Sequence, residues 1–461
     1  MGTMALSSFV KKHGYEVDVF IHQLEKDLVG AVLEVEPDIL AFSASTTEHQ
    51  FALKLIEKLK AETNLPIIMG GPHPTFYPEI IEHPNIDFIC RGEGEYALLE
   101  LLGALKDGTD CTKIKNIWMK KDGKIIKNEE RSLIADLDTL PMPDRELYYR
   151  RYEVLRNSPT KAVYFIRGCP FNCTYCFNKA MKDMYKGKGA YVRARSVEKC
   201  ISELKYIVEN STTEWFHFND DTLNVNRKWF YELLNRYKEE VRLGFICNLR
   251  IDFADEKMID KLSEAGVDRI NFGVEHGNEQ FRREVLKRDM ANEHIINLGK
   301  YMKKKGIRIF TANIIGFPGE TIGMAMETIR LNSYFKPEFA SCDILQPYPK
   351  TEIANYAIKK GCLASDYSID SLGRTNIAHS HNVNSSYSII KQDNIRRLEN
   401  IHKFFHYMVM YPFLNPIFLL LSKLPPNKIF AHIWQLPEIR KKIRYSSGFK
   451  AKLKEFMKLF N

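Results

Sequence analysis

Three cysteines within eight residues constrain this chain more than any other feature of its sequence. Cys169, Cys173 and Cys176 follow the apolar run 162–166, which we predict to be a buried strand. The cysteines therefore lie in a loop at the carboxyl end of a strand, where α/β proteins place their chemistry.

Three close thiolates without a fourth partner favour an iron–sulfur cluster. Structural zinc takes four ligands, commonly as two cysteine pairs, and no second pair lies nearby. A disulfide would use two of the thiols and leave the third. Cysteine thiolates at short spacings hold iron–sulfur clusters, and a [4Fe–4S] cluster with three protein ligands keeps one iron open. The turn residues Gly168 and Pro170 argue against an accidental group of buried cysteines.

The spacing Cys-x3-Cys-x2-Cys, with the aromatic Tyr175 before the last cysteine, resembles the radical S-adenosylmethionine (SAM) superfamily. The resemblance implies that the open iron binds the amino and carboxylate groups of SAM. It also implies that an electron from the cluster cleaves the sulfonium and releases a 5′-deoxyadenosyl radical. Such an enzyme needs an external electron donor of the flavodoxin or ferredoxin type.

Composition and charge indicate where in the cell we expect the protein and which kind of partner we expect it to bind. The start of the chain lacks the charged and long apolar regions of a signal peptide, and unpaired cysteines fit a reducing cytosol, so we expect a cytoplasmic protein. The formal net charge of +9 comes entirely from the residues after 401, where the chain has eleven Lys or Arg and two Glu. A nucleic-acid enzyme more often carries its basic patch around the active site, so we expect no nucleic acid and instead an acidic partner for the tail.

The first 110 residues alternate predicted strands and helices, which indicates a doubly wound parallel sheet. The predicted strands cover 16–20, 39–43, 66–71 and 87–90, with amphipathic helices at 48–62 and 95–106. The loops after the last three strands are rich in small residues, and glycine lets a ligand approach the backbone closely. The candidate binding residues in these loops are Ser43, Ser45, Gly70, Gly71, His73, Gly92 and Gly94.

In this order ahead of the cysteine motif, the loops resemble the cobalamin-binding domain of the B12-dependent radical SAM family. The resemblance implies a flavodoxin-like (Rossmann-type) domain over residues 1–110 and cobalamin contacts from those seven residues. Residues 4–14 resemble the first helix of that domain, so we expect its first strand and loop to be missing and cobalamin to bind less tightly than in a chain extended upstream. A lone histidine is more often structural, and we assign His73 no bond to cobalt.

A connector and a second α/β domain follow. Residues 111–157 include a hairpin at 117–126 with an Asp-Gly turn and an extended segment at 136–143. Residues 158–355 contain six predicted strands separated by helices, which implies a parallel βα barrel. Six units rather than eight suit the partial (β/α)6 barrel of radical SAM enzymes. The predicted strands are 162–167, 215–219, 243–249, 269–275, 308–316 and 340–346.

The strand ends of the barrel carry candidate SAM contacts. SAM requires carboxylates near its cationic groups and ribose diol, which Asp220, Asp221 and Glu275 provide. It also requires apolar surface for the adenine, for which Tyr175, Phe177 and Ile315 are candidates. The resemblance implies that Glu275 meets the ribose and that Ile315 and Gly316 pack the adenine.

Two of these assignments have structural alternatives. Asp220 and Asp221 could instead cap a helix predicted at 222–237. Arg250 is a candidate for the SAM carboxylate or for a structural ion pair.

The C-terminal region, residues 356–461, is predicted to be mainly helical and ends in a basic, amphipathic tail. Residues 363–387 are polar candidates for lining a substrate pocket. The apolar run 404–421 is interrupted by Pro412 and Pro416, so it is a poor spanning helix. Two interpretations remain, a helical cover over the barrel or a surface that meets a membrane or a lipid-like substrate.

The resulting hypothesis is a cobalamin-dependent radical SAM enzyme that methylates an unactivated carbon of a small molecule. The second hypothesis is a radical cyclase or rearrangement enzyme on the same scaffold. The third is a non-catalytic iron–sulfur electron carrier, which would have no need of the carboxylates and glycines at the barrel strand ends.

Overall fold

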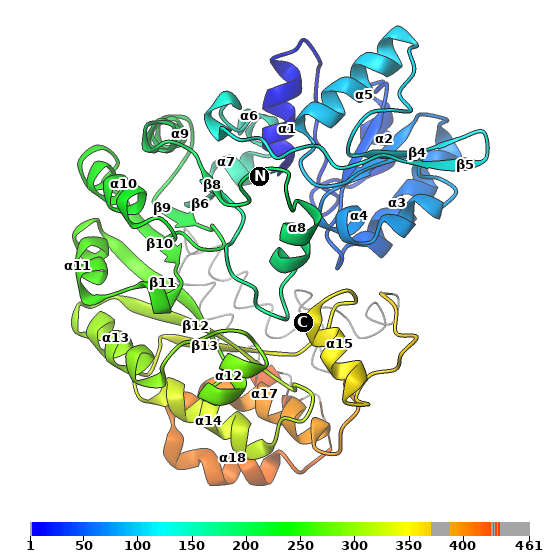
Figure 1. The fold of residues 1–461 in the computed structure, drawn as a ribbon. Helices are drawn as coiled ribbons and strands as arrows, with labels where there is room; N and C mark the ends of the chain where they lie inside the picture. Colours follow the sequence, from blue (N-terminus) through cyan, green and yellow to red (C-terminus); the bar gives the residue numbers. More distant parts are fainter. Residues whose placement is uncertain (1, 370–387, 426, 428, 431, 434–461) are drawn as a thin grey trace. The chain divides into compact units, whose positions relative to one another are not determined.

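The computed structural model describes residues 2–369, 388–425, 427, 429–430 and 432–433 of the chain (Figure 1). The chain forms two compact units. The first comprises Met1–Asn157 and Ala180–Arg195, and the second comprises Ser158–Lys179 and Ser196–Asn461.

The first unit contains a five-stranded sheet. Its strands, in both chain and spatial order, are β1 (Leu40–Ser43), β2 (Ile67–Gly70), β3 (Phe88–Cys90), β4 (Ile117–Lys121) and β5 (Lys124–Lys127). The first three are parallel, as predicted, and the last two are antiparallel. The hairpin predicted in the connector therefore extends this sheet. Its turn residues Asp122 and Gly123 have φ of +50° and +72°, as a tight two-residue hairpin turn requires.

Helices cover both faces of this sheet. Ile67 and Met69 belong to one buried apolar cluster and Ile68 to another, as the alternation of side chains along a strand requires. The helices of this part are α1 (Gly2–Lys11), α2 (Leu28–Leu33), α3 (His49–Glu62), α4 (Pro72–Phe76), η1 (Pro78–Glu82), α5 (Glu95–Asp107), η2 (Leu137–Thr139), α6 (Glu146–Tyr149) and α7 (Glu153–Arg156).

The strand predicted at 16–20 is wrong. This segment joins no sheet, and β1 is the edge strand among the described residues. Two side chains bind the backbone here instead of a neighbouring strand: Arg150 donates to the Val17 carbonyl (2.9 Å), and the N–H of Ile21, just after the segment, donates to the Tyr152 hydroxyl (2.7 Å). An apolar, β-branched sequence forms a strand only where a neighbouring strand can pair with it.

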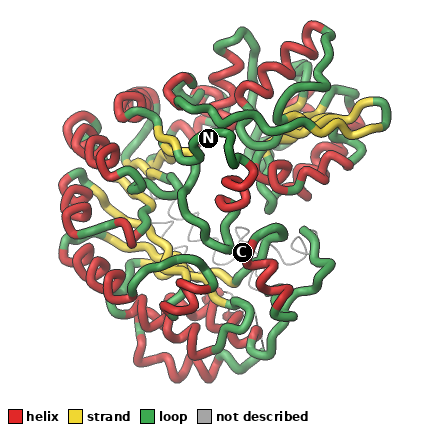
Figure 2. Tube along the Cα trace, in the orientation of Figure 1, coloured by secondary structure: helices red, strands yellow, loops and turns green. Residues whose placement is uncertain are grey.

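The second unit contains a six-stranded, all-parallel sheet whose spatial order follows the chain. Its strands are β6 (Thr160–Val163), β9 (Trp215–Phe218), β10 (Gly244–Asn248), β11 (Val267–Glu275), β12 (Arg308–Ile315) and β13 (Phe339–Ile344). The helices between them are α9 (Val197–Asn210), α10 (Arg227–Glu240), η3 (Ile251–Phe253), α11 (Glu256–Glu264), α12 (Glu279–Glu284), α13 (Asn292–Lys304) and α14 (Ile322–Ser333). Figure 2 shows the main helices along the outside of the curved sheet, which confirms the predicted partial barrel.

The first barrel strand is shorter than predicted. We predicted a strand over 162–167, but β6 ends at Val163 and a separate short strand, β7 (Ile166–Arg167), follows. The N–H groups of Phe165 and Ile166 donate to the carboxylate of Asp220 instead of continuing the ladder. A further short strand and helix lie on the connection to α9, namely β8 (Arg193–Ala194) and α8 (Asn178–Met184).

Helices also form the described part of the C-terminal region, and they are α15 (Glu352–Lys359), α17 (Ile395–Met410), η4 (Pro412–Leu414) and α18 (Asn415–Leu421). The inner residues of α17, including Phe404 and Met408, share one apolar cluster with residues of β13 and α14. Most of the polar segment 363–387 and of the basic tail lies outside the described residues. Of the helices described, none combines the length and apolarity that crossing a bilayer would take.

We expect Phe404→Ala to lower the free energy of unfolding by about 3–5 kcal/mol, because the ring is fully buried against Phe418 and Phe430. The matched control is Phe413→Ala, since Phe413 is 77% exposed and its loss should change stability by no more than about 0.5 kcal/mol. Urea titration followed by circular dichroism measures both. Equal effects of the two substitutions would contradict the assignment of α17 to the core.

Candidate functional site

The three cysteines lie in the loop that follows β7, at the carboxyl end of the first strand region of the barrel. Cys173 is buried, and Cys169 and Cys176 are half-buried. Thr174, between them, anchors the loop because its N–H and hydroxyl donate to the carbonyls of Leu286 (3.3 Å) and Val285 (2.8 Å). The loop is thus held against the segment that follows α12.

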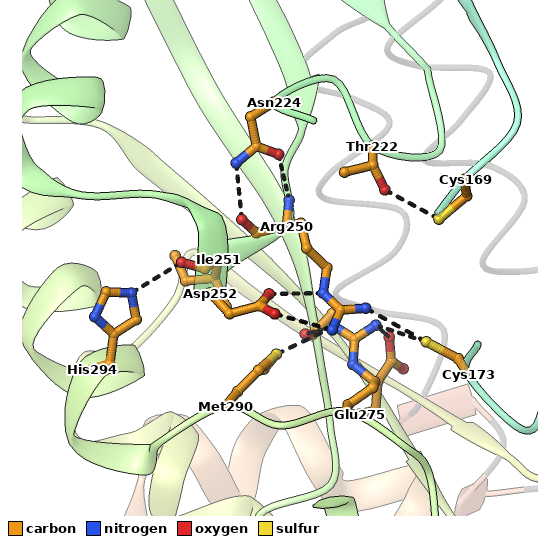
Figure 3. Close-up of polar contacts among 12 residues, drawn as sticks. Cys169, Cys173, Thr222, Asn224, Arg250, Ile251, Asp252, Glu275, Met290 and His294 are labelled. Carbon is orange, nitrogen blue, oxygen red and sulfur yellow. Dashed lines mark hydrogen bonds and ion pairs between the residues drawn. The ribbon is translucent and has the colours of Figure 1, made fainter. Parts of the chain in front are cut away.

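Each thiol faces a polar partner. Cys169 contacts the Thr222 hydroxyl at 3.5 Å, as Figure 3 shows. The backbone and side-chain N–H groups of Asn178 both donate to Cys176 at 3.5 Å. Burial raises the pKa of the Cys176 thiol, and these hydrogen bonds act in the opposite direction. In the described part of the chain, no three His, Cys, Asp or Glu side chains converge as a single-ion site would require.

Arg250 lies at the end of β10 and donates to Cys173 at 3.5 Å (Figure 3). The same guanidinium makes two hydrogen bonds to Asp252, at 2.7 and 3.1 Å, and stacks 3.9 Å above the Phe171 ring. The structural ion pair predicted as one alternative for Arg250 is therefore present. A contact with the SAM carboxylate stays a prediction.

Arg288 is a second buried cation at this thiol, and sequence reasoning missed it. Its guanidinium donates to Cys173 at 3.8 Å, to the Tyr175 hydroxyl at 3.2 Å and to the Gly273 carbonyl at 2.7 Å. Burial alone would lower its pKa, but the negative groups around it, with Glu275 among them, raise the pKa of Arg288 above its ordinary value. Arg288 does not directly follow a strand, so its position in the sequence did not indicate a role in the site.

Glu275 completes this cluster from the end of β11. Its Oε1 lies 3.6 Å from Arg288, and the side chain is buried. The residue has φ of +64°, which is rare outside glycine, and the strand register shifts between Gly273 and Glu275. A Cβ on Gly273 would lie 1.9 Å from Glu275 Oε1. The glycine and the strained backbone together fold the carboxylate back over the strand, and such strain is concentrated at functional sites.

Asp220 holds the approach to the cysteine loop. Its Oδ1 accepts the N–H groups of Phe165 (2.8 Å) and Ile166 (2.7 Å), and no hydrogen-bond partner is found for Oδ2 within the described residues. Burial raises the pKa of Asp220 to about 7. Asp221 accepts from Asn178 at 3.0 Å, which links it to Cys176.

The alternative of a helix cap at Asp220 and Asp221 is wrong. The helix begins at Arg227, five residues later than predicted, and its cap is Asn226, whose side chain accepts the Trp229 N–H. Both aspartates are therefore committed to the cysteine loop and not to a helix end.

At the end of β12, only some of the predicted adenine contacts are available to a ligand. The Ile315 side chain is fully buried in the cluster under α17, so only its backbone is left for a ligand. The Gly316 N–H (2.6 Å) and the Phe317 N–H (3.0 Å) donate to Glu320. The other Glu320 oxygen lies 3.3 Å from Nε2 of the buried His276. Glu320, which we did not predict, thus fixes this strand end.

The aromatic candidates lie beside the loop. Tyr175 packs with the apolar cluster around Phe317, and burial raises its pKa well above the ordinary value. The ring of Phe177 lies 5.4 Å from that of Tyr348, between centroids.

Three asparagines form a row that we did not predict, two of them on the adjacent strands β10 and β11 and one directly after β9. Asn271 donates to Asn248 (2.9 Å), which donates to Asn219 (3.1 Å). Asn219 donates to the hydroxyl of Tyr164. At the other end, Arg269 donates to Asn271 (3.0 Å). We call Asn219, Asn248 and Asn271 the amide row.

The amide row lies on the face of the sheet turned away from the helices. On β11, Ile270 and Phe272 belong to the core that packs against the helices, so Asn271 between them points to the inside of the partial barrel. The Tyr164 end of the row lies five residues before Cys169. The row therefore lies on the inner wall of the partial barrel, and its Tyr164 end is close in sequence to the cysteine loop.

In the first unit, the predicted loops contact one another. The His73 N–H donates to the Ala44 carbonyl (3.0 Å), and the Gly92 N–H donates to the Thr75 hydroxyl (3.0 Å). Gly71 has φ of +94°, and a Cβ there would lie 3.0 Å from the Ala44 carbonyl oxygen. Loops from three strand ends thus form one surface, as predicted for the carboxyl edge of a parallel sheet.

Several candidate cobalamin residues in these loops are accounted for by protein contacts. A Cβ on Gly92 would lie 1.7 Å from the Tyr185 hydroxyl, and one on Gly94 would lie 3.3 Å from Leu6. Gly70 has only ordinary contacts, and Ser45 donates to Glu48 on the exposed side, at 2.7 Å. Ser43 lies at the end of β1, next to the Gly71 position.

His73 stacks on a second buried histidine. The rings of His49 and His73 lie 4.1 Å apart and nearly parallel, and both side chains are almost fully buried. His49 also contacts the Thr46 carbonyl at 2.6 Å. This supports the structural role expected for His73, while contacts of the seven loop residues with cobalamin stay predictions.

We expect Asp220→Asn to change the pH dependence of stability. Because the folded-state pKa of Asp220 lies above the ordinary value of about 3.9, folding opposes its ionisation, and the wild type loses stability as the pH rises from about 4 to 7. The amide keeps an acceptor for Phe165 and Ile166 but cannot ionise. Between pH 5 and pH 8 the wild type should therefore lose about 2–3 kcal/mol relative to the variant.

Urea titrations at the two pH values measure this difference. The comparison variant is Asp221→Asn, because Asp221 is exposed and its charge is only a minor influence on the pKa of Asp220, so this variant should keep most of the wild-type pH dependence. The same pH dependence in the wild type and in Asp220→Asn would contradict the prediction.

Two family models and several known proteins match this chain. The family model of the B12 binding domain matches residues 1–102, and that of the radical SAM superfamily matches residues 163–331. An uncharacterized methyltransferase of Pyrococcus horikoshii is 30% identical over 341 residues, which are 73% of this chain and 73% of that protein. An anaerobic magnesium-protoporphyrin IX monomethyl ester cyclase of Rubrivivax gelatinosus is 26% identical over 76% of this chain, which spans 64% of that protein.

A similar fold occurs in the radical SAM methyltransferase TsrM of Kitasatospora setae. The structure of TsrM with tryptophan substrate and a SAM analogue aligns with a TM-score of 0.69 and 16% identity over 96% of both chains. Another structure of the same protein contains cobalamin and a [4Fe–4S] cluster. At this level of identity the likeness concerns the fold.

Proposed function

This chain belongs to the cobalamin-dependent radical SAM enzymes, and we propose that it transfers a methyl group to an unactivated carbon of a small-molecule substrate. Its cofactors are a [4Fe–4S] cluster, SAM and cobalamin. When bound, the cluster supplies the electron that cleaves SAM, and cobalamin carries the methyl group. The observation that carries the proposal is the set of three thiols at the end of the first barrel strand, each in contact with a polar group.

The residues around the thiols fit a cluster with three protein ligands. Thiolates carry negative charge, and Arg250 and Arg288 place two buried cations at Cys173. Hydrogen bonds and charge around the sulfurs tune the potential of an iron–sulfur cluster. In the proposal, Cys169, Cys173 and Cys176 hold three of the irons.

The carboxylates at the strand ends are proposed to orient SAM. Glu275 is already paired with Arg288, so a ligand hydroxyl would meet a carboxylate fixed in place and not a mobile one. Asp221 and the backbone at Ile315 and Gly316 complete the proposed SAM contacts. Asp220 acts through the cysteine loop, whose path it sets.

The amide row is proposed to face the substrate. Its members carry both donors and acceptors on the inside of the barrel, close to the cysteine loop. An external flavodoxin or ferredoxin is the proposed electron donor. The proposal also includes contact of the C-terminal region with an acidic membrane surface.

A cyclase or rearrangement on the same scaffold is the second candidate, and the similarity to the Rubrivivax cyclase favours it. The third hypothesis, a non-catalytic electron carrier, has no support from the two relatives described above, which are named as a methyltransferase and a cyclase.

The proposed function is tested by following both products of SAM in an anaerobic assay with labelled SAM and a chemical reductant. Methyl transfer predicts 5′-deoxyadenosine together with S-adenosylhomocysteine. The nucleoside alone would favour the cyclase, and neither product from the cluster-loaded protein would contradict both.

We expect the anaerobically reconstituted protein to hold about four irons per chain and Cys169→Ala, Cys173→Ala and Cys176→Ala each to lose most of this iron, because each removes one cluster ligand. Iron analysis and visible absorption spectroscopy measure the cluster. Cys200→Ala is the matched control, since Cys200 is fully buried in the core under α9 and should leave iron content unchanged. Zinc instead of iron in protein purified without oxygen would refute the cluster assignment.

A further inference from the structure

Large exposed apolar side chains gather in one short segment of the described chain. Six of the sixteen that the structure describes lie between Tyr411 and Ile429, whereas the other ten are scattered from Leu24 to Tyr334. Four of the six that are more than half exposed lie in this segment as well, namely Phe413 (77%), Ile417 (55%), Leu420 (65%) and Ile429 (69%). Single exposed apolar residues are ordinary, but a contiguous group marks an interaction surface.

The exposed residues follow a helical spacing from η4 through α18 and just beyond it: Phe413 lies in η4, Ile417 and Leu420 lie in α18, and Leu424 follows the end of α18. Phe413, Ile417, Leu420 and Leu424 follow one another at intervals of four, three and four residues, which places them on one face of a helix. The opposite face is occupied as well, because Phe418 packs on Phe404 with ring centroids 5.1 Å apart. A short helix that is apolar on all sides normally lies inside a protein. Here the described residues cover only the inner side.

The same segment offers no acidic side chain to a basic partner. Between residues 400 and 437 the sequence has no Asp or Glu. Lys423 is exposed beside the stripe. Lys403, in contrast, is buried near Glu399 and is not part of this surface.

The sequence beyond the described residues adds to this charge. From residue 434 onward it holds eight Lys or Arg residues and two Glu. An apolar stripe next to an excess of cations matches the surface of an anionic bilayer, whose headgroups attract Lys and Arg and whose acyl boundary accepts apolar side chains.

We propose that the stripe of Phe413, Ile417, Leu420 and Leu424 inserts into the headgroup region of an anionic membrane, with α18 lying in the plane of the surface. Pro412 and Pro416 interrupt the run, so the segment suits lying on a bilayer and not crossing it. This inference makes the membrane contact of the proposed function specific, and it is independent of the SAM chemistry.

Deleting the whole tail cannot test this inference, because residues 402–410 belong to the core of the second unit. Surface substitutions separate the two roles. The test variant is Ile417→Ser with Leu420→Ser in the full-length, cluster-loaded protein. The matched control is Val154→Ser with Tyr334→Ser, since these apolar residues are 63% and 53% exposed but lie elsewhere. Lys423→Glu tests the charge by itself.

Sedimentation with vesicles measures binding, using 70:30 phosphatidylcholine and phosphatidylserine against pure phosphatidylcholine. We expect the wild type to bind the anionic vesicles, the control to match it and the stripe variant to bind at least tenfold less tightly. Lys423→Glu should bind about fivefold less tightly. In 1 M salt, where the Debye length is about 3 Å, binding of the wild type should also weaken.

Three outcomes would overturn the inference. The first is no binding of the wild type, and the second is equal binding by the stripe variant. The third is equal binding to neutral and anionic vesicles, which would indicate an apolar ligand without charge recognition. Self-association that the stripe variant abolishes, without vesicle binding, would assign the surface to a second copy of the chain. We expect all variants to keep the wild-type melting temperature and the wild-type rate of 5′-deoxyadenosine formation. These controls would show that the variants are folded and that vesicle binding is separate from the SAM chemistry.

Discussion

The contact of the Cys173 thiol with two buried guanidinium groups is the interaction on which the rest of the site depends. A buried cation is costly unless it is paired, so each arginine brings its own partners, Asp252 for Arg250 and Glu275 for Arg288. The second pair in turn requires the bare backbone of Gly273 and the left-handed backbone of Glu275. One thiol thus accounts for a chain of constraints that spans three strand ends.

Buried carboxylates set the path of the chain where two barrel strands end. Asp220 accepts two successive backbone N–H groups after β6, and Glu320 accepts two after β12. Each replaces ladder hydrogen bonds that the strand can no longer make, which satisfies the donors of a buried turn. Burial disfavours the ionised form of Asp220 and raises its pKa to about 7. The same buried carboxylate fixes the position of the cysteine loop.

Features that depend on a local sequence pattern were predicted correctly. Features that depend on a contact with a residue distant in the sequence were not. Alternating apolar runs located the six barrel strands, and cysteine spacing located the loop, because both signals lie within a few residues. The segment 16–20 has a strand pattern but no strand to pair with. Ile315 was expected to face a ligand, yet strand alternation turns its side chain into the cluster under α17. Arg288 acts through tertiary contacts that no sequence spacing indicates, whereas Glu320 binds the backbone N–H groups three and four residues before it.

Glycines show how the same sequence signal can have different causes. Gly92 and Gly71 both have positive φ and both lie in loops expected to bind cobalamin. At Gly92 the space of a side chain is filled by Tyr185 of the same unit, so the glycine is required even without a ligand. At Gly71 the backbone of the neighbouring loop imposes the same requirement. A glycine-rich strand end therefore indicates close approach, and only the structure tells whether a ligand or the protein itself makes that approach.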